Sequence, residues 1–169
     1  MEIVIEVSAL MCIILAGMGF GMLCTEHLKT NVEVCRETEK MLRICAHCLK
    51  SSDADIYSII GRLKSEGFEH LCFMSQLSEQ YDAECDIRSE WKNALKKCTA
   101  LADEEMRLLI EIGSSLGTAD TESQLKLLSA QLDEVHEMYE RRCSEYRTKG
   151  KLYRSLGILA GVTVGIMVI

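Results

Sequence analysis

VSALMCIILAGMGFGMLC, residues 7–24, is a run of 18 residues without a charged side chain, and it decides the fold class. As an α-helix this run would be about 27 Å long, close to the hydrocarbon thickness of a bilayer. Two glutamates precede it, whereas a cleavable signal peptide begins with positive residues. Leu23 also stands where a lipoprotein signal would need a small residue. We therefore expect an N-terminal transmembrane anchor over residues 1–24.

The other end of the chain carries a second uncharged run, SLGILAGVTVGIMVI, residues 155–169. Its 15 residues would extend roughly 22 Å as a helix, which is short for a membrane span. Tyr153 and Arg154 can lengthen the span, because such side chains lie at the membrane interface. The alternative is a buried helix in a soluble core. We expect a C-terminal transmembrane anchor over residues 153–169.

The glycines favour the membrane over the soluble core. Gly157, Gly161 and Gly165 follow one another at four-residue spacing, and Gly17 and Gly21 repeat that spacing in the first run. In a soluble helix each glycine would cost about 1 kcal/mol relative to alanine. In a membrane the same spacing forms a smooth ridge that allows close contact between helices. The two anchors would pack together, or each would pack against a copy in another subunit.

Positive charges flank the inner ends of both runs. Lys149, Lys151 and Arg154 precede the second run, and Lys29 follows the first, whereas the outer flanks contain no lysine or arginine. Basic residues are concentrated on the cytoplasmic side of membrane helices. We expect residues 25–152 in the cytoplasm and both termini outside.

The middle of the chain is predicted to be a helical bundle, which makes the fold all-α. The sequence contains no proline and 5% aromatic residues, a composition that suits long helices better than strands. Apolar residues recur at three- and four-residue spacing. The predicted helices cover residues 35–49, 56–66, 68–81, 87–98, 101–116 and 120–150. The first is expected to continue out of the N-terminal anchor, and the last to run into the C-terminal one.

Charge and cysteine content narrow the classes of function. The chain has a net charge of −7, and residues 25–148 carry −8, which argues against nucleic acid as a partner. The nine cysteines are odd in number and spread through helical patterns, unlike a secreted disulfide framework. We interpret them as reduced thiols that pack as small hydrophobic side chains.

The string Cys45-Ala46-His47-Cys48 is the strongest candidate for metal or redox chemistry. On a helix the two cysteines share a face, but His47 points away from both, so the three cannot converge on a tetrahedral zinc ion. The other histidines stand apart in the sequence. We therefore predict no catalytic, cofactor-binding or metal-binding residues, and a protein that is not an enzyme.

The carboxy-terminal half resembles a known family. The run Ile112-Gly113-Ser114-Ser115-Leu116-Gly117, followed by Asp120 and Gln124, and the later run Ser155–Gly161 look like the stage III sporulation protein AB family of endospore-forming Firmicutes. Trp91–Leu95 resembles the tryptophan-containing helix of that family. The likeness is good over residues 90–169 and loose over 25–89, where the family's threonine-proline turn is replaced by Cys45–Asp55.

This resemblance implies a place in the channel complex that joins the mother cell to the forespore, in the mother-cell membrane. The soluble part of the family is similar to the cytoplasmic domain of the inner-membrane platform protein of type II secretion systems. The implied partners are a secretion-type ATPase, stage III sporulation protein AA, and other membrane components, with homo-oligomerisation possible. The alternative is a membrane-anchored helical signalling or regulatory module unrelated to secretion. Glu111, Ser114 and Ser115 form a candidate partner patch, although this stretch also suits a packed helix end.

Overall fold

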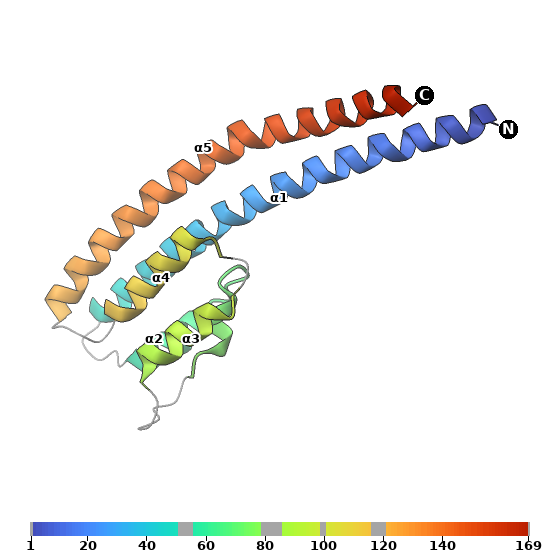
Figure 1. The fold of residues 1–169 in the computed structure, drawn as a ribbon. Coiled ribbons are helices and arrows are strands. Elements are labelled where there is room, and N and C mark those ends of the chain that lie inside the picture. The colour runs from blue at the N-terminus through green and yellow to red at the C-terminus, as the bar shows by residue number, and fades with distance from the viewer. Residues whose placement is uncertain (1, 51–55, 79–85, 99–100, 116–120, 169) are drawn as a thin grey trace. The chain divides into compact units, whose positions relative to one another are not determined.

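The computed structural model describes residues 2–50, 56–78, 86–98, 101–115 and 121–168, and all regular elements in these ranges are helices. The all-α prediction is confirmed. The chain forms α1 (Glu2–Lys50), α2 (Ile56–Ser65), the short 3-10 helix η1 (Cys72–Gln76), α3 (Ile87–Lys96), α4 (Asp103–Ser115) and α5 (Thr121–Val168) (Figure 1). The sequence also predicts that Ser51-Ser52-Asp53 interrupts the first helix and that Gly117 caps the helix over 101–116, but these residues lie outside the described part of the chain.

Two helices account for most of the chain. As expected, the first cytoplasmic helix continues without a break out of the N-terminal apolar run, so that α1 has 49 residues. The last helix likewise continues into the C-terminal run, so that α5 has 48 residues. The absence of proline makes such lengths possible, because no backbone N–H is missing from either helix.

The chain divides into two compact units. One, here called the helix pair, combines residues 1–32 with residues 140–169. The other, here called the helical domain, comprises residues 33–139. The predicted boundaries at residues 24 and 152 concern burial in a membrane, which is a different division, and they stay predictions.

The apolar core belongs to the helical domain. The largest fully buried side chains come from α1, α2, η1, α3, α4, α5 and the segment before η1, and they include Met41, Ile60, Leu71, Phe73, Leu95, Leu109, Ile112 and Val135. The predicted stripe on α1 is buried at Cys35, Thr38, Leu42 and Cys45. The 3–4 spacing of apolar residues therefore identified the core-facing side of this helix.

The predicted helix over residues 68–81 is wrong. Gly67, which the sequence predicts to end the helix over 56–66, has a φ of +63°, and the chain then forms only the five-residue η1. The backbone N–H groups of residues 69–71 are bound by a carboxylate of α1 instead of by helical carbonyls. Residues 79–81 lie outside the described part of the chain.

Candidate functional site

The helix pair is held at its centre by direct contact between glycine backbones. A Cβ atom placed on Gly17 would lie 2.6 Å from the carbonyl oxygen of Gly157 and 3.2 Å from Cα of Gly161. A Cβ atom on Gly157 would lie 2.6 Å from the carbonyl oxygen of Gly17 and 3.3 Å from Cα of Gly21. These separations are too short for any side chain. The structure therefore brings four of the five predicted packing glycines together within one chain.

Two further glycines, Gly165 and Gly19, lie in the same two helices as the contact glycines. Gly165, the fifth predicted packing glycine, lies in α5, but its contacts fall outside what the structure describes. Gly19 lies between the two contact glycines of α1, and a Cβ atom there would meet no atom within 4 Å. Gly19 is thus the natural control position for substitutions in the contact.

The contact between the two helices continues toward the charged ends of the apolar runs. Thr25 is buried, and its hydroxyl donates to the carbonyl oxygen of Gly21 at 2.8 Å and to that of Gly150 at 3.4 Å. A Cβ atom on Gly150 would lie 3.4 Å from the Thr25 methyl group. The threonine therefore fills the space beside Gly150 and extends the close approach of α1 and α5.

The sides of the helix pair that face away from the glycines are apolar and exposed. Large side chains on α1, such as Leu15, Phe20 and Leu23, are 61–71% exposed, and Leu156 and Leu159 on α5 are 57% and 61% exposed. Monomeric soluble proteins rarely expose apolar patches of this kind. This pattern, with glycines inside and large apolar groups outside, is typical of helices packed in lipid.

Only part of the predicted membrane attachment is supported by helix length and composition. Within the described residues, one helical segment, Met11–Lys50, is long and apolar enough to cross a membrane. The C-terminal run belongs to a long helix, but it does not meet the same criterion in the described residues. A C-terminal transmembrane helix stays a prediction.

Charged groups of the helix pair lie beside the two apolar runs, before the C-terminal run in α5 and after the N-terminal run in α1. The carboxylate of Glu145 accepts from Lys149 at 3.0 Å and from Arg142 at 3.2 Å. The hydrogen bond from Lys149, together with that from Arg142, lowers the pKa of Glu145. Lys29 pairs with Glu26 at 3.4 Å on α1.

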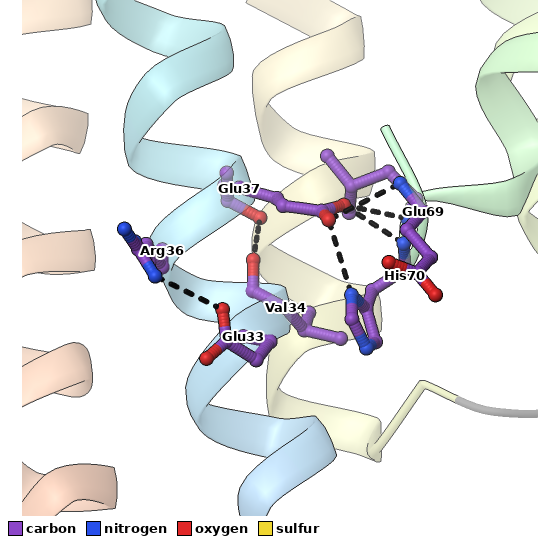
Figure 2. A network of polar contacts seen from close by, with 8 residues as sticks. Glu33, Val34, Arg36, Glu37, Glu69 and His70 are labelled. Carbon is purple, nitrogen blue, oxygen red and sulfur yellow. Dashed lines mark hydrogen bonds and ion pairs between the residues drawn. The ribbon is translucent and has the colours of Figure 1, made fainter. Parts of the chain in front are cut away.

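A second polar site, inside the helical domain, is built around Glu37 of α1 (Figure 2). Its two carboxylate oxygens accept the backbone N–H groups of Glu69, His70 and Leu71 at 2.9–3.1 Å. The His70 ring nitrogen Nδ1 lies 3.0 Å from Glu37 Oε1. Three successive N–H groups converging on one carboxylate make an anion-binding turn. We call this arrangement the Glu37 clamp.

The turn before the clamp is attached to α1 by a second residue. Lys40, three residues after Glu37, pairs with Glu66 at 2.9 Å and lies over the Phe68 ring at 5.4 Å from its centre. Hydrogen bonding to Lys40 lowers the pKa of Glu66. Neither Glu37 nor Lys40 is part of an apolar pattern, which is why sequence periodicity did not identify this site.

The tryptophan-containing helix α3 packs tightly against α4. The Trp91 indole nitrogen donates to the carbonyl oxygen of Leu109 at 2.8 Å, and its ring meets Phe73 edge-on at 4.9 Å. A Cβ atom on Gly113 would lie 2.3–2.6 Å from atoms of the Trp91 ring. Gly113 is therefore the residue that gives the indole room on α4.

The predicted partner patch lies in the last turns of α4. Glu111 and Ser114 are exposed, but Ser115 is half-buried, and its hydroxyl oxygen lies 3.4 Å from Gln131 Nε2 of α5. The Ser114 and Ser115 hydroxyls donate back to the carbonyl oxygens of Glu111 and Ile112. A partner patch at these positions requires all three side chains to be exposed, and this expectation is wrong for Ser115, which contacts Gln131 of α5.

The cysteines fall into two groups. Cys45 and Cys48 are buried on the core-facing side of α1, whereas His47 is exposed. Burial, with the neighbouring Cys48, raises the pKa of the Cys45 thiol from 9.0 to about 12. No three His, Cys, Asp or Glu side chains among the described residues come close enough to hold a metal ion.

Cys72 and Cys98 correct the expectation of nine separate thiols. The structure joins them in a disulfide between η1 and the end of α3, with Cα atoms 6.6 Å apart. The pair is 26 residues apart in the sequence, and neither residue shows a spacing motif, so the sequence gives no signal for it. Among the described residues, the cysteines that form no disulfide are Cys12, Cys24, Cys35, Cys45, Cys48 and Cys143.

Comparison with known proteins identifies the family. The family model for stage III sporulation protein AB matches residues 6–169, nearly the whole chain. The chain belongs to the stage III sporulation protein AB family. No curated protein and no solved structure gave a match. The matched residues include the contact glycines, the Glu37 clamp and Trp91, so all the sites described above lie within the part of the chain that matches the family.

Proposed function

We propose that this member of the stage III sporulation protein AB family is a non-enzymatic platform of the channel complex between mother cell and forespore. Membership of the family supports a role in sporulation. In the proposed role the chain needs no cofactor. It holds a helical domain at the membrane and offers that domain to a secretion-type ATPase, stage III sporulation protein AA, and to other membrane components.

The observation that carries the membrane part of this proposal is the glycine contact. Gly17 and Gly157 meet backbone to backbone, while large apolar side chains around them remain exposed. In water this arrangement would leave the apolar surface uncovered at a cost of roughly 25 cal/mol per Å². In lipid the same surface is solvated, and close backbone packing supplies the attraction between helices. We therefore propose that α1 and α5 cross the membrane together as a hairpin.

The proposed orientation follows from the charges beside this hairpin. Lys149 and Lys151 precede the second apolar run, and Lys29 follows the first. In the membrane-proximal parts of a loop, such residues favour the cytoplasmic side. The helical domain would then lie in the cytoplasm of the mother cell, and both termini would lie across the membrane.

The helical domain suits a docking role because it is built to keep one shape. The Glu37 clamp attaches the turn after α2 to α1, and Trp91 attaches α3 to α4. A surface held in one conformation binds with less loss of conformational entropy than a flexible one. The contacts made by Glu37 and Trp91 therefore support the proposal that the helical domain acts as a scaffold.

The test uses the full-length chain, tagged and expressed in sporulating cells. The membrane fraction is solubilised in mild detergent, and the tagged chain is purified with whatever accompanies it. We expect the secretion-type ATPase to co-purify, and a tagged unrelated membrane hairpin to recover none. Recovery of the chain from membranes without the ATPase would overturn the platform role. Recovery of the chain from the soluble fraction would overturn the membrane attachment.

A further inference from the structure

The exposed side of α3 carries a stripe of positive charge. Arg88, Lys92 and Lys96 follow one another at four-residue spacing, so they line one side of the helix. All three are exposed, whereas the opposite side buries Trp91 and Ala94 in the core. We call Arg88, Lys92 and Lys96 the basic stripe. It is unusual in this chain, because residues 25–148 carry a net charge of −8.

The basic stripe lacks the ion-pair partners that Arg36, Lys40 and Arg43 have. Arg36 and Arg43 pair with glutamates of their own helix, and Lys40 pairs with Glu66. Among the described residues, no ion pair includes a member of the basic stripe. Glu90 of α3 accepts instead from the backbone N–H of Ser78. The positive charge of this surface is therefore not neutralised within the described chain.

The basic stripe is also held rigidly. Asp86 caps the start of α3 by accepting the backbone N–H of Arg88 at 3.3 Å. The indole of Trp91 anchors the middle of the helix to Leu109. A stripe on a fixed helix presents its charges at constant spacing, which favours recognition of another ordered surface.

The complementary surface is present on the same chain. Asp133, Glu134 and Glu137 lie on one side of α5, are exposed, and form no ion pair among the described residues. We call these three residues the acidic stripe. Within one chain no described ion pair joins the two stripes.

We propose that the basic stripe of α3 binds the acidic stripe of α5 on a second copy of this chain. A two-fold pair would use both stripes of each copy, whereas a head-to-tail pair leaves one basic and one acidic stripe free. Repetition of the head-to-tail contact builds a ring or a row of copies. This inference rests on the proposed membrane attachment, but not on the channel role or on the ATPase.

The membrane makes such a contact effective. Exposed ion pairs are individually weak and are screened by salt. Confinement to a membrane raises the concentration that each copy experiences from its neighbours, so weak contacts add up. Association should therefore be strong in vesicles and should fall as salt is raised.

The experiment uses the full-length chain in vesicles of neutral phosphatidylcholine. A zero-length carbodiimide reagent couples lysine amines to carboxylates that are in contact. With an equal mixture of isotope-labelled and unlabelled copies, we expect mixed-label products that join Lys92 or Lys96 to Asp133, Glu134 or Glu137. The yield should fall when salt rises from about 0.05 M to about 0.5 M.

Charge reversal supplies the matched controls. The double variant Lys92→Glu/Lys96→Glu should lower the dimer yield by at least about fivefold. Lys50→Glu/Arg62→Glu makes the same change of charge at exposed positions on α1 and α2, and should leave the yield unchanged. Mixing the α3 variant with Glu134→Lys/Glu137→Lys copies should restore crosslinking between the two, because the reversed stripes match each other and the unchanged stripes of the two copies also match.

Two outcomes would overturn the self-association. One is a dimer yield that does not respond to reversal of either stripe. The other is a basic stripe that binds anionic vesicles but gives no mixed-label product. A chain that fails to float with vesicles would instead contradict the proposed membrane attachment, so the two failures are distinguishable.

Discussion

At the scale of single residues, several positions matter through their immediate surroundings. Gly113 leaves room for the Trp91 ring, Glu37 satisfies three backbone donors, and Cys45 keeps its proton in the core. The first two join residues from different elements or from different stretches of chain, whereas the third depends on burial of the thiol. Single substitutions at these positions should therefore change the stability of the whole helical domain.

Gly113→Ala should destabilise the helical domain. The added methyl group would lie 2.3–2.6 Å from the Trp91 ring, so α3 and α4 must separate, at a cost of about 1–3 kcal/mol. Thermal unfolding of the full-length chain in detergent, followed by the fluorescence of its single tryptophan, measures the change. Ser114→Ala, at the exposed neighbouring position, is the control and should shift stability by less than about 0.5 kcal/mol. Equal melting of both variants would contradict the tight contact.

Glu37→Ala should also destabilise the domain, because three N–H groups would lose their shared carboxylate. Hydrogen bonds to a charged group contribute about 1.5–3 kcal/mol, and unpaired donors that stay partly buried add to the loss. Hydrogen exchange at residues 69–71 should accelerate in the variant. Glu33→Ala, which removes a glutamate one turn earlier on α1, should leave exchange at these residues unchanged. Slow exchange in Glu37→Ala would show that other contacts hold this turn.

Alkaline pH should weaken the fold through Cys45. Burial raises the pKa of this thiol to about 12, whereas in an unfolded chain it stays near 9.0. As pH rises, the unfolded chain therefore releases the thiol proton first. The stability of the folded chain is unaffected by this thiol below pH 9 and decreases between about pH 9 and pH 12. Unfolding in urea should show a steeper loss of stability with pH for the wild type than for Cys45→Ala. Parallel pH profiles would contradict this origin.

At the scale of elements, the sequence predicted the helices in which the backbone N–H and C=O groups bond to each other within the same helix. α1 and α5 have the 3–4 pattern over residues 35–49 and 120–150 and contain no proline, and both were expected to run into the apolar ends. The segment after Gly67 could not be predicted, because its N–H groups bind Glu37, a residue more than thirty positions away.

The spacing of the glycines indicated that they pack against a helix, but spacing left open whether the glycines meet in one chain or between chains.

In the purified chain, outside the reducing cytoplasm, the Cys72–Cys98 disulfide should make the stability of the helical domain depend on redox conditions. A disulfide that closes a loop of this length contributes about 3 kcal/mol by restricting the unfolded chain, and Cys72 and Cys98 are 26 residues apart. The melting temperature of the wild type should fall when dithiothreitol is added. Cys72→Ser should melt at the lower temperature with or without the reductant. A wild type that melts identically in both conditions would show that the pair does not form in solution.

At the scale of the whole molecule, the glycine contact and the helical domain have separate tasks in the proposed function. In that proposal the contact would let α1 and α5 enter a membrane together, and the domain would provide surfaces for other proteins. Both units lie within the part of the chain that matches the sporulation family. Substitutions in the contact should therefore impair sporulation without unfolding the domain.

The most direct measurement is the number of heat-resistant spores formed by an endospore-forming host whose only copy of this protein carries Gly157→Leu. A leucine there would displace the α1 backbone, because a single Cβ atom already lies 2.6 Å from the carbonyl oxygen of Gly17. We predict a spore count close to that of the deletion strain, at wild-type protein level by immunoblot. Gly19→Leu, at a position with no atom within 4 Å, should sporulate like the wild type. Wild-type spore numbers from Gly157→Leu cells would contradict the account.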